Sequence, residues 1–489
     1  MDRTIRTALF GLVLLAGFDL AAATNRLNVL LIMADDLNTR LACYGSKEVK
    51  SPNIDELAQL GMRFEHAYSH YPICNPSRAA LLSGRRPGTT RVLGNNTPPR
   101  KYLPGVAFLP EYFHEHGYFT ARVGKIAHGP FNSHVRWDAS FDPPRDQNSS
   151  RVTWLATTND DANESDGFSA RKAVQLLETN RDKPFFIAAG FDKPHLPLVA
   201  PKKYFDLYPL DTIPLPDEPK NVRKGVPWVA FTSRGGPWNS ATEERQAIAA
   251  YYACISFIDA QVGILLDGLK RLDLMGRTII VLTSDHGFHL GEHGGLWRKS
   301  TLFEESARVP LIVWSPGITN GGAVCPRIIE HVDLFPTVAE LCGLPRPAGL
   351  EGQSFTPLLN EPSAAWDKAA ITVFVRGTVL GNIVGQSIRT EQWRYTEWDL
   401  GRRGTELYDH VADPREWTNL AQRAEYKARV QELKTRLHEI SPQPKAGIST
   451  AAKVYTSVLV SLAVIAAIVV FRRRQTNPPI ASDRSDSRN

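Results

Sequence analysis

Cysteine is scarce in this chain. The 489 residues include only five cysteines: Cys43, Cys74, Cys254, Cys325 and Cys342. So few cysteines exclude a small scaffold held together by disulfides. If Cys74 is reserved for chemistry, four cysteines remain. Closeness in sequence alone then makes Cys325 and Cys342 the candidate disulfide pair.

The sequence also lacks a run of basic residues interleaved with aromatic ones. Its formal net charge is +6, and several of the positive residues lie at the two ends of the chain. We therefore expect no nucleic-acid partner. A hydrophobic content of 43% and a charged content of 22% are ordinary for a globular protein. The length suffices for one large domain plus a smaller one.

The two ends of the chain resemble targeting segments. Residues 1–23 combine Arg3 and Arg6, an apolar centre from Ala8 to Phe18 and a small-residue cleavage site at Ala21–Ala23. This pattern predicts a signal peptide and an exported protein, the alternative being a buried N-terminal helix.

Near the C-terminus, Val454 to Phe471 form an uncharged run of 18 residues, followed by Arg472, Arg473 and Arg474. As a helix this run would span roughly 27 Å, close to the apolar thickness of a bilayer of about 30 Å. We expect a transmembrane helix over 454–471 and a cytoplasmic tail over 472–489, because positive residues favour the cytoplasmic side. A removable sorting tail is the competing interpretation.

Between these ends, apolar strands alternate with helical segments. Continuous apolar runs at Leu27–Ala34, Pro184–Ala189, Thr278–Thr283 and Val309–Trp314 predict strands buried on both faces of a sheet. The longest predicted helix covers Glu243–Leu272. This alternation predicts an α/β fold with a large, mostly parallel sheet flanked by helices over residues 24–371. Shorter strands and a final helix at 421–439 predict a smaller C-terminal α+β subdomain over residues 372–445.

The chain is organised around the stretch from Cys74 to Arg85, which reads C-N-P-S-R-A-A-L-L-S-G-R. Asn75 is typical of a helix N-cap, Pro76 fits the first turn, and Gly84 is a plausible end of the helix. Cys74 would then lie at the positive end of a short helix, which lowers a thiol pKa and favours negative ligands. Arg78 would lie one turn further on, on the same side. Taken alone, Cys74 could equally be a structural loop cysteine.

Acidic residues follow two of the predicted strands. Asp35 and Asp36 end the first apolar run, and Asp285 follows the strand at 278–283. Ligand sites of open α/β sheets lie beyond the carboxyl ends of the strands, so these three side chains should converge. Because adjacent ionised carboxylates require a cation, they predict a divalent metal. The alternative is that each aspartate only caps a loop.

The stretch at Cys74 resembles the signature of the type I sulfatases, C-x-P-S-R-x-x-x-L-[ST]-G-R. This resemblance implies an alkaline-phosphatase/sulfatase-like fold, with Cys74 oxidised by a maturation enzyme to formylglycine, whose hydrate attacks sulfur. It also implies one calcium ion, held by Asp35, Asp36, Cys74 in its oxidised form, Asp285 and His286. Most of the family has asparagine at the position of His286, and imidazole is a poorer ligand for a hard cation than oxygen.

Three further stretches, G-K-I-A-H, K-P-H-L-P-L and T-S-D-H-G-F-H-L-G-E-H-G-G-L-W-R-K, are similar to segments of the iduronate-2-sulfatase-like branch. By this resemblance Lys125 and His128 flank the formylglycine, and His128 takes a proton from its hydrate. His195 and Lys299 contact the sulfate, and His195 protonates the departing sugar oxygen. Arg78 holds the formylglycine side chain. Each of these residues taken alone would more often be a surface or core group than a catalyst.

Together these observations predict an exported, membrane-tethered sulfatase at the periplasmic or extracellular face. Its expected substrate is a sulfated saccharide, with a 2-O-sulfated uronic acid as the candidate unit. Two alternatives remain: a phosphodiesterase or phosphonate hydrolase on the same fold, and a non-catalytic surface protein that binds glycans.

Overall fold

The computed structural model describes residues 26–144, 153–231, 240–319, 321–378 and 381–442. The predicted signal peptide, the apolar run at 454–471 and the tail after it lie outside the described residues. Within them, one helix, α8 (Ala241–Arg271), is long and apolar enough to cross a membrane. Of its most apolar window, 89% is buried inside the fold, which is the position of a core helix.

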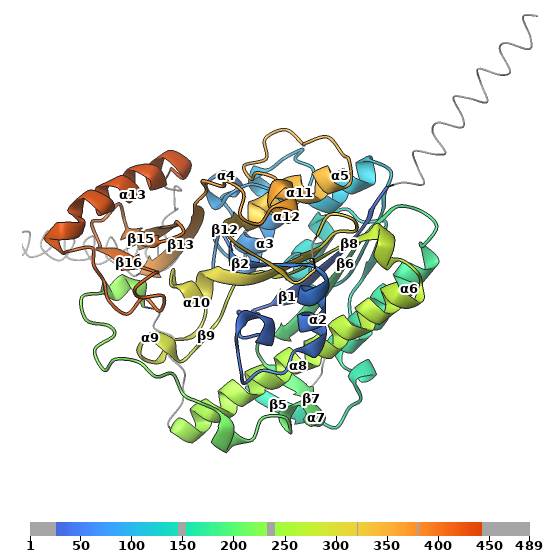
Figure 1. Ribbon diagram of the computed structural model, residues 1–489, viewed down its shortest axis with the longest axis horizontal. Coiled ribbons are helices and arrows are strands. Elements are labelled where there is room, and N and C mark those ends of the chain that lie inside the picture. Colours follow the sequence, from blue (N-terminus) through green and yellow to red (C-terminus); the bar gives the residue numbers. More distant parts are fainter. Residues whose placement is uncertain (1–25, 145–152, 232–239, 320, 379–380, 443–489) are drawn as a thin grey trace, which may run out of the picture.

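A sheet of eight strands forms the centre of the described part of the chain (Figure 1). Its order is β12-β2-β11-β8-β1-β6-β3-β4. Every neighbouring pair is parallel except those of β11, which runs antiparallel to both β8 and β2. The predicted mostly parallel sheet is therefore confirmed. The strands are β1 (Asn28–Asp35), β2 (Met62–Tyr68), β3 (Phe119–Gly124), β4 (Ala139–Phe141), β6 (Phe185–Pro194), β8 (Thr278–Ser284), β11 (Arg308–Trp314) and β12 (Ala323–Glu330).

Strand β1 shows why the sheet needs cover on both faces. All eight of its residues are buried. Successive side chains of a strand point to opposite faces, and accordingly Leu30 and Ile32 join one hydrophobic core while Leu31 and Met33 join the other. A continuous apolar run is thus what a central strand of a three-layer fold requires.

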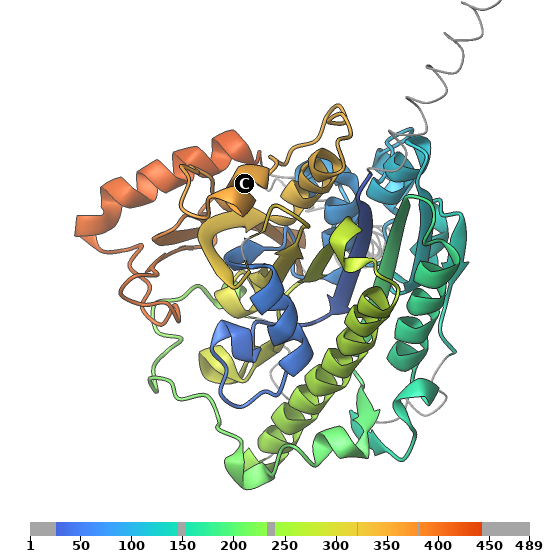
Figure 2. The same cartoon turned by 45° about the vertical axis from the view of Figure 1, so that its right-hand side comes forward.

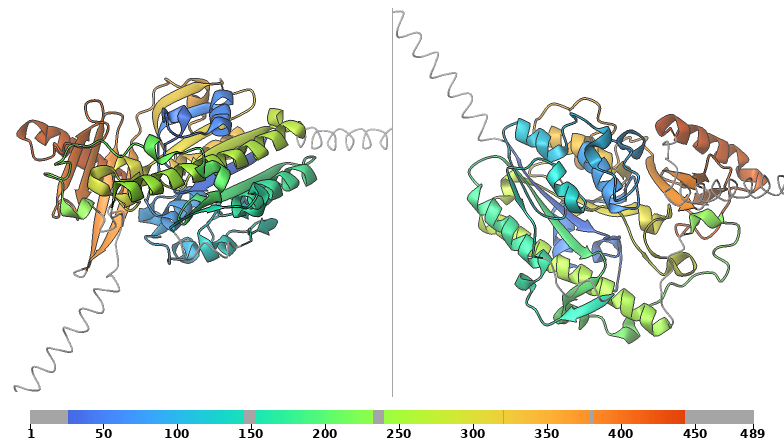
Figure 3. Two further views of the ribbon diagram at one scale, coloured as in Figure 1. Left: turned by 90° about the horizontal axis from the view of Figure 1, so that it is seen from below. Right: turned by 180° about the vertical axis from the view of Figure 1, so that it is seen from behind.

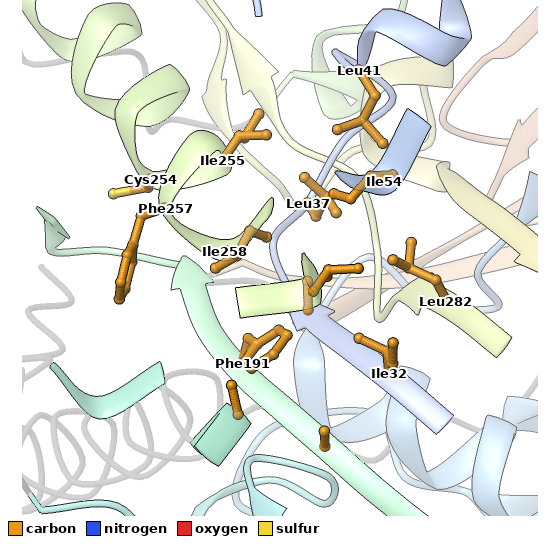
Figure 4. Packing of buried hydrophobic residues seen from close by; sticks show 14 of the residues in the cluster. Ile32, Leu37, Leu41, Ile54, Phe191, Cys254, Ile255, Phe257, Ile258 and Leu282 are labelled. Atoms are coloured by element: carbon orange, nitrogen blue, oxygen red, sulfur yellow. The ribbon is translucent and has the colours of Figure 1, made fainter. Parts of the chain in front are cut away.

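Helices cover the two faces of the sheet. Residues of α2, α6 and α8 line one core, and residues of α3, α5, α11 and α12 line the other. Helix α8 runs obliquely across its face (Figure 2), and Figure 4 shows Ile255 and Ile258 of α8 beside Ile32 and Leu282 of the sheet. The helices on the two faces are α2 (Pro52–Leu60), α3 (Cys74–Ser83), α5 (Leu109–Glu115), α6 (Ser165–Thr179), α11 (Leu334–Leu341) and α12 (Thr356–Asn360).

A small antiparallel sheet lies to one side of this core (Figure 3). Its order is β13-β14-β15-β16, and α13 packs on it. The sheet is joined to the large one through β13, where the Val373 N–H donates to His70 O at 2.9 Å and Thr372 Oγ1 donates to Ser69 O at 2.8 Å. The elements are β13 (Ala370–Thr378), β14 (Gly381–Arg389), β15 (Trp393–Trp398), β16 (Thr405–Asp409) and α13 (Lys427–Ile440).

Short elements fill the connections. They include η7 (Trp228–Ala230), which lies in the long proline-rich segment before α8. The remaining strands and α-helices are α4 (Pro87–Thr90), β5 (Trp154–Thr157), β7 (Leu198–Pro201), α7 (Lys202–Phe205), β9 (His289–Leu290), α9 (Glu292–Gly295), β10 (Trp297–Arg298) and α10 (Glu304–Ala307). Strand β5 pairs with β7 in a separate two-stranded parallel sheet.

One sequence-based expectation about this fold is wrong. Cys325 and Cys342 form no disulfide, and all five cysteines are free thiols. The Sγ of Cys325 lies 3.5 Å from Pro362 O, whereas that of Cys342 lies 3.6 Å from Leu27 O. Closeness in sequence did not bring the two thiols together, because each packs against a different segment.

Candidate active site

Helix α3 places Cys74 at the centre of the site. The helix begins at Cys74 itself with Ile73 as N-cap, so the predicted cap at Asn75 is wrong. The Asn75 side chain instead donates to Gly94 O at 3.0 Å and Thr97 O at 2.8 Å, which fixes the neighbouring loop. The predicted end at Gly84 is confirmed, since Gly84 adopts φ 64°, a conformation that favours glycine.

The thiol of Cys74 is fully buried among charged groups. Its Sγ lies 3.2 Å from Lys299 Nζ, 3.4 Å from Asp35 Oδ1 and 3.5 Å from His286 Nε2. Burial, reinforced by the Asp35 carboxylate, raises the pKa of the Cys74 thiol although Lys299 opposes the change. The prediction that the helix terminus lowers the pKa of the Cys74 thiol is therefore wrong, because burial and a nearby negative charge outweigh the helix dipole.

The three predicted aspartates converge beside Cys74. Strands β1 and β8 pair in parallel with Ala34 opposite Ser284, so Asp35 and Asp285 leave the same edge of the sheet. The Asp36 N–H donates to Asp285 Oδ1 at 3.1 Å across 249 positions of sequence. All three carboxylates are buried. The prediction that these three side chains converge, which was based on the carboxyl ends of the strands, is therefore confirmed.

His286 completes a set of groups suited to a metal ion. Its Nδ1 donates to Gly287 O at 3.0 Å. Its Nε2 faces Asp36 Oδ1 at 3.4 Å and Asp285 Oδ2 at 3.6 Å. In the neutral imidazole this Nε2 would offer its lone pair to a metal ion beside the carboxylates. The ligand atoms of Asp35, Asp36, Cys74 and His286 all lie within 4.8 Å of one another, and this set fits a divalent cation.

Three positive side chains surround the aspartates. Lys125 Nζ contacts Asp35, Lys299 Nζ contacts Asp36, and Arg78 Nε donates to Asp285 Oδ2 at 2.9 Å. Although burial opposes ionisation, Lys125, His195, Arg78 and Lys299 hold the pKa of Asp35 well below its usual range. Burial also opposes the ionisation of Asp36, but Lys299 and His195 lower its pKa. Asp35 and Asp36 are therefore suited to act as anionic metal ligands.

The two histidines predicted to transfer protons have pKa values shifted in opposite directions. His195 Nε2 lies 4.0 Å from Asp36 Oδ2, and despite burial the Asp35 and Asp36 carboxylates raise the pKa of His195. For His128, burial and the charge on Lys125 lower the pKa to about 4, and its buried Nδ1 has no hydrogen-bond partner among the described residues. His195 is thus suited to donate a proton and neutral His128 to accept one.

The structure adds residues that the sequence did not single out. Ser77 Oγ donates to Asp285 O. The Tyr251 hydroxyl on α8 donates to Asp36 O at 2.7 Å and accepts from the Asn38 N–H at 2.9 Å. Ser77 lies within the recognised stretch and could have been inferred, whereas nothing local marks Tyr251, which is 215 positions from Asp36.

The fold and the site together define a hydrolase of the alkaline-phosphatase-like class. Its solved relatives include a phosphonate monoester hydrolase of Agrobacterium radiobacter (TM-score 0.74, 25% identity, 85% of this chain and 95% of that chain). Another is a 2-O GAG sulfatase (TM-score 0.69, 26% identity, 85% of this chain and 91% of that chain).

Sequence comparison gives the family. The Sulfatase family model matches residues 27–344, and the model for the C-terminal part of N-sulphoglucosamine sulphohydrolase matches residues 291–443. A sulfatase of Formosa agariphila is 32% identical over 447 residues, covering 84% of this chain and 86% of that protein. Iduronate 2-sulfatase of Homo sapiens is 35% identical over 402 residues, covering 68% of this chain and 72% of that protein. The chain belongs to the sulfatase family and is an enzyme that hydrolyses sulfate esters.

Proposed function

We propose that this enzyme releases sulfate from a sulfated saccharide by means of a formylglycine made from Cys74. The observation that carries the proposal is the position of Cys74, where one buried side chain meets Asp35, His286 and Lys299 within 3.5 Å. The names of relatives support the substrate class: iduronate 2-sulfatase and the ulvan-active sulfatase of Formosa agariphila are both among the similar proteins. A 2-O-sulfated uronic acid is the first substrate unit to test.

The roles of the surrounding residues follow from their charges. The hydrated aldehyde would supply one hydroxyl to attack sulfur and a second to expel sulfate. A divalent cation, for which calcium is our proposal, would be held by Asp35, Asp36, the modified Cys74, Asp285 and His286, and would withdraw charge from the sulfuryl oxygens.

The chain's own side chains would do the rest. Lys125 and Lys299 would stabilise the negative charge of the transition state. His128 would accept a proton from the hydrate, and His195 would protonate the leaving sugar oxygen. Arg78, which donates to Lys125 O at 2.5 Å and Ile126 O at 3.1 Å, would fix the helix carrying the nucleophile.

The location of the enzyme is a further part of the proposal. The composition of residues 1–23 supports export, and the run at 454–471 supports a membrane anchor after a catalytic domain at 24–371 and a subdomain at 372–445. Cell fractionation of the full chain, followed by protease treatment from outside, tests this directly. Recovery of a soluble full-length protein would contradict the anchor.

The test of activity is a screen of defined sulfated saccharides with free sulfate as the readout. The full chain should be produced together with a formylglycine-generating enzyme, with Cys74→Ala as the matched control. We expect sulfate release from at least one 2-O-sulfated uronate, and a tryptic peptide mass showing oxidised Cys74. An intact cysteine in a fully active sample would contradict the formylglycine mechanism.

A second candidate activity is favoured by one observation, the similarity to a phosphonate monoester hydrolase at a TM-score of 0.74. Matched sulfate, phosphate-diester and phosphonate substrates with the same leaving group separate the two. A higher kcat/KM for the phosphonate would make this second activity the principal one.

A further inference from the structure

Arg376 joins the small sheet to the loop that carries Lys299. It lies near the end of β13 and is partly buried. Its Nε donates to Val229 O at 2.7 Å, and its Nη2 donates to Ser300 O at 3.1 Å. One guanidinium therefore connects η7 with the residue that follows Lys299.

Arg376 differs from the buried arginines around it in having no acidic partner within the described ranges. Arg78 pairs with Asp285, and Arg394 with Glu304 and Glu416. Arg376 instead hydrogen-bonds only to carbonyls, and its guanidinium lies 5.1 Å from the ring of Phe374 and 5.7 Å from that of Trp398. Burial lowers the pKa of Arg376 to about 10, so it remains charged at neutral pH. A cation that is partly removed from water without a counter-charge is costly unless an anion joins it.

The hydrogen bond to Ser300 O places Arg376 next to the segment that carries Lys299, although Arg376 and Ser300 are 76 positions apart in sequence. Lys299 precedes Ser300, and its Nζ contacts Asp36 and lies 3.2 Å from Cys74 Sγ. Arg298 and Ser300 both have positive φ, 76° and 79°, so the backbone on either side of Lys299 is strained and must be held in place. On the other side of Arg376, the residue before Val229 is Trp228, which is 64% exposed.

We propose that Arg376 binds a second anionic group of the saccharide, next to the sulfate ester that is hydrolysed. The inference rests on the proposed function and specifies its substrate as one that carries an additional oxyanion. A uronate carboxylate and a second sulfate present the same chemistry to a guanidinium, because both accept two parallel hydrogen bonds. Arg376 is thus a residue that determines specificity.

A purely structural role makes a different prediction. If Arg376 only held Ser300 and η7 in place, its loss would displace Lys299 and lower activity on every substrate by the same factor. If it binds an anion, its loss would mainly raise KM, and only for substrates that carry the second anion. The two roles are therefore separated by a comparison of substrates.

The experiment measures kcat and KM for Arg376→Gln and Arg376→Lys in the full, matured chain. The substrates are 4-nitrophenyl sulfate, a 2-O-sulfated uronate disaccharide, its carboxyl-reduced counterpart and a reduced counterpart bearing a second sulfate. We expect Arg376→Gln to raise KM about tenfold or more for the anionic saccharides and less than about twofold for the other two substrates. Arg376→Lys should fall between, because lysine keeps the charge but not the paired donors.

The matched control is Arg402→Gln, which removes an exposed positive charge from the small sheet and should change no KM. The relative losses on the carboxylate and on the second sulfate identify which group Arg376 binds. A uniform loss on all four substrates, or no loss on any, overturns the proposal. Failure of the unmodified enzyme to release sulfate from all four would instead contradict the proposed function itself, and the Arg376 proposal with it. If Arg376→Gln does not fold, Arg376→Lys alone carries the comparison.

Discussion

Among the buried clusters of histidines and carboxylates in the described part of the chain, two can be compared directly, and one of these two has the features of an active site. The first, the Cys74 cluster, contains Asp35, Asp36, Cys74, Asp285 and His286. The second, the junction cluster, lies between the α9–α10 segment and the small sheet (Figure 1). It contains His293, Glu304, Glu305, Arg394, His410 and Glu416. Each includes three or more ligand atoms within 4.8 Å of one another.

The clusters can be compared by the ion pairs they form and by the exposure of their charged side chains. In the junction cluster, Arg394 contacts both Glu304 and Glu416, His410 Nε2 lies 2.8 Å from Glu416, and His293 Nε2 lies 3.1 Å from Glu305. These ion pairs tie α10 to β15 and to the loop after β16. In the Cys74 cluster, the cations include lysine side chains that are 16% and 15% exposed. A substrate anion can reach such lysines. Glu305 of the junction cluster is 22% exposed, however, so exposure alone does not separate the clusters. Residue type and exposure therefore do not identify the site, whereas the position of Cys74 among the aspartates that follow β1 and β8 does.

The largest expected effect comes from the nucleophile. Cys74→Ala should lower kcat by at least about 10⁴-fold, because it removes the group on which the covalent step depends. Circular dichroism and thermal melting should be nearly unchanged. Residual turnover above one per cent, in protein shown by mass spectrometry to carry alanine, would place the nucleophile elsewhere.

Metal removal should affect the Cys74 cluster alone. Dialysis against a chelator should lower sulfate release by about 10²-fold or more, with recovery on addition of calcium. Asp285→Asn should weaken calcium binding, since it deletes one of three carboxylate charges. Elemental analysis of the active enzyme checks the stoichiometry. A fully active, metal-free sample would refute the metal site.

The junction cluster should respond in stability and not in chemistry. Glu416→Gln leaves Arg394 and His410 without their shared carboxylate, and should destabilise the fold by about 3–5 kcal/mol. Glu432→Gln, which breaks an exposed pair with Arg429, should cost no more than about 1 kcal/mol. Denaturant unfolding measures both. A loss of kcat per folded molecule in Glu416→Gln would remove the distinction between the clusters.

The smallest expected effect is a pH dependence of stability. Although burial opposes it, Glu305 raises the pKa of His293 to about 9, against about 6.5 in the unfolded chain. A raised pKa contributes stability that is fully present below pH 6.5 and is lost as the pH rises through 9. We expect on the order of 3 kcal/mol of such loss. His293→Gln should flatten the curve between these values, and an unchanged slope in this variant would assign the dependence to another group.

Several features of the site were predictable from the sequence because they depend on local rules. Asp35 and Asp285 follow apolar strands, and parallel strands end at one edge, so their convergence could be inferred over 250 positions. Cys74 and Arg78 lie on one short helix. The C-terminal α+β subdomain was predicted as well, from its shorter strands. The antiparallel direction of β11 and the attachment of the small sheet through β13 had no comparable signal.

The errors arose where burial or distant packing decides. The pKa of Cys74 depends on burial and on Asp35, and neither can be inferred from the position of Cys74 at the start of a helix. Tyr251 reaches Asp36 from α8, and Arg376 reaches Ser300 from β13, and no nearby motif marks either residue. The proposed pairing of Cys325 with Cys342 failed because sequence distance does not measure spatial distance.

The complete burial of Cys74 also has a consequence in time. The thiol is closed in by residues of β1 and by those that follow β8, and Ser284 at the end of β8 lies 210 positions after Cys74. At about 5–20 residues per second, synthesis of that interval takes roughly 10–40 s. During it Cys74 has been made but β8 has not, so the thiol is not yet enclosed by the finished fold. If Cys74 is oxidised as proposed, the oxidising enzyme would therefore have to reach it before β8 packs beside β1.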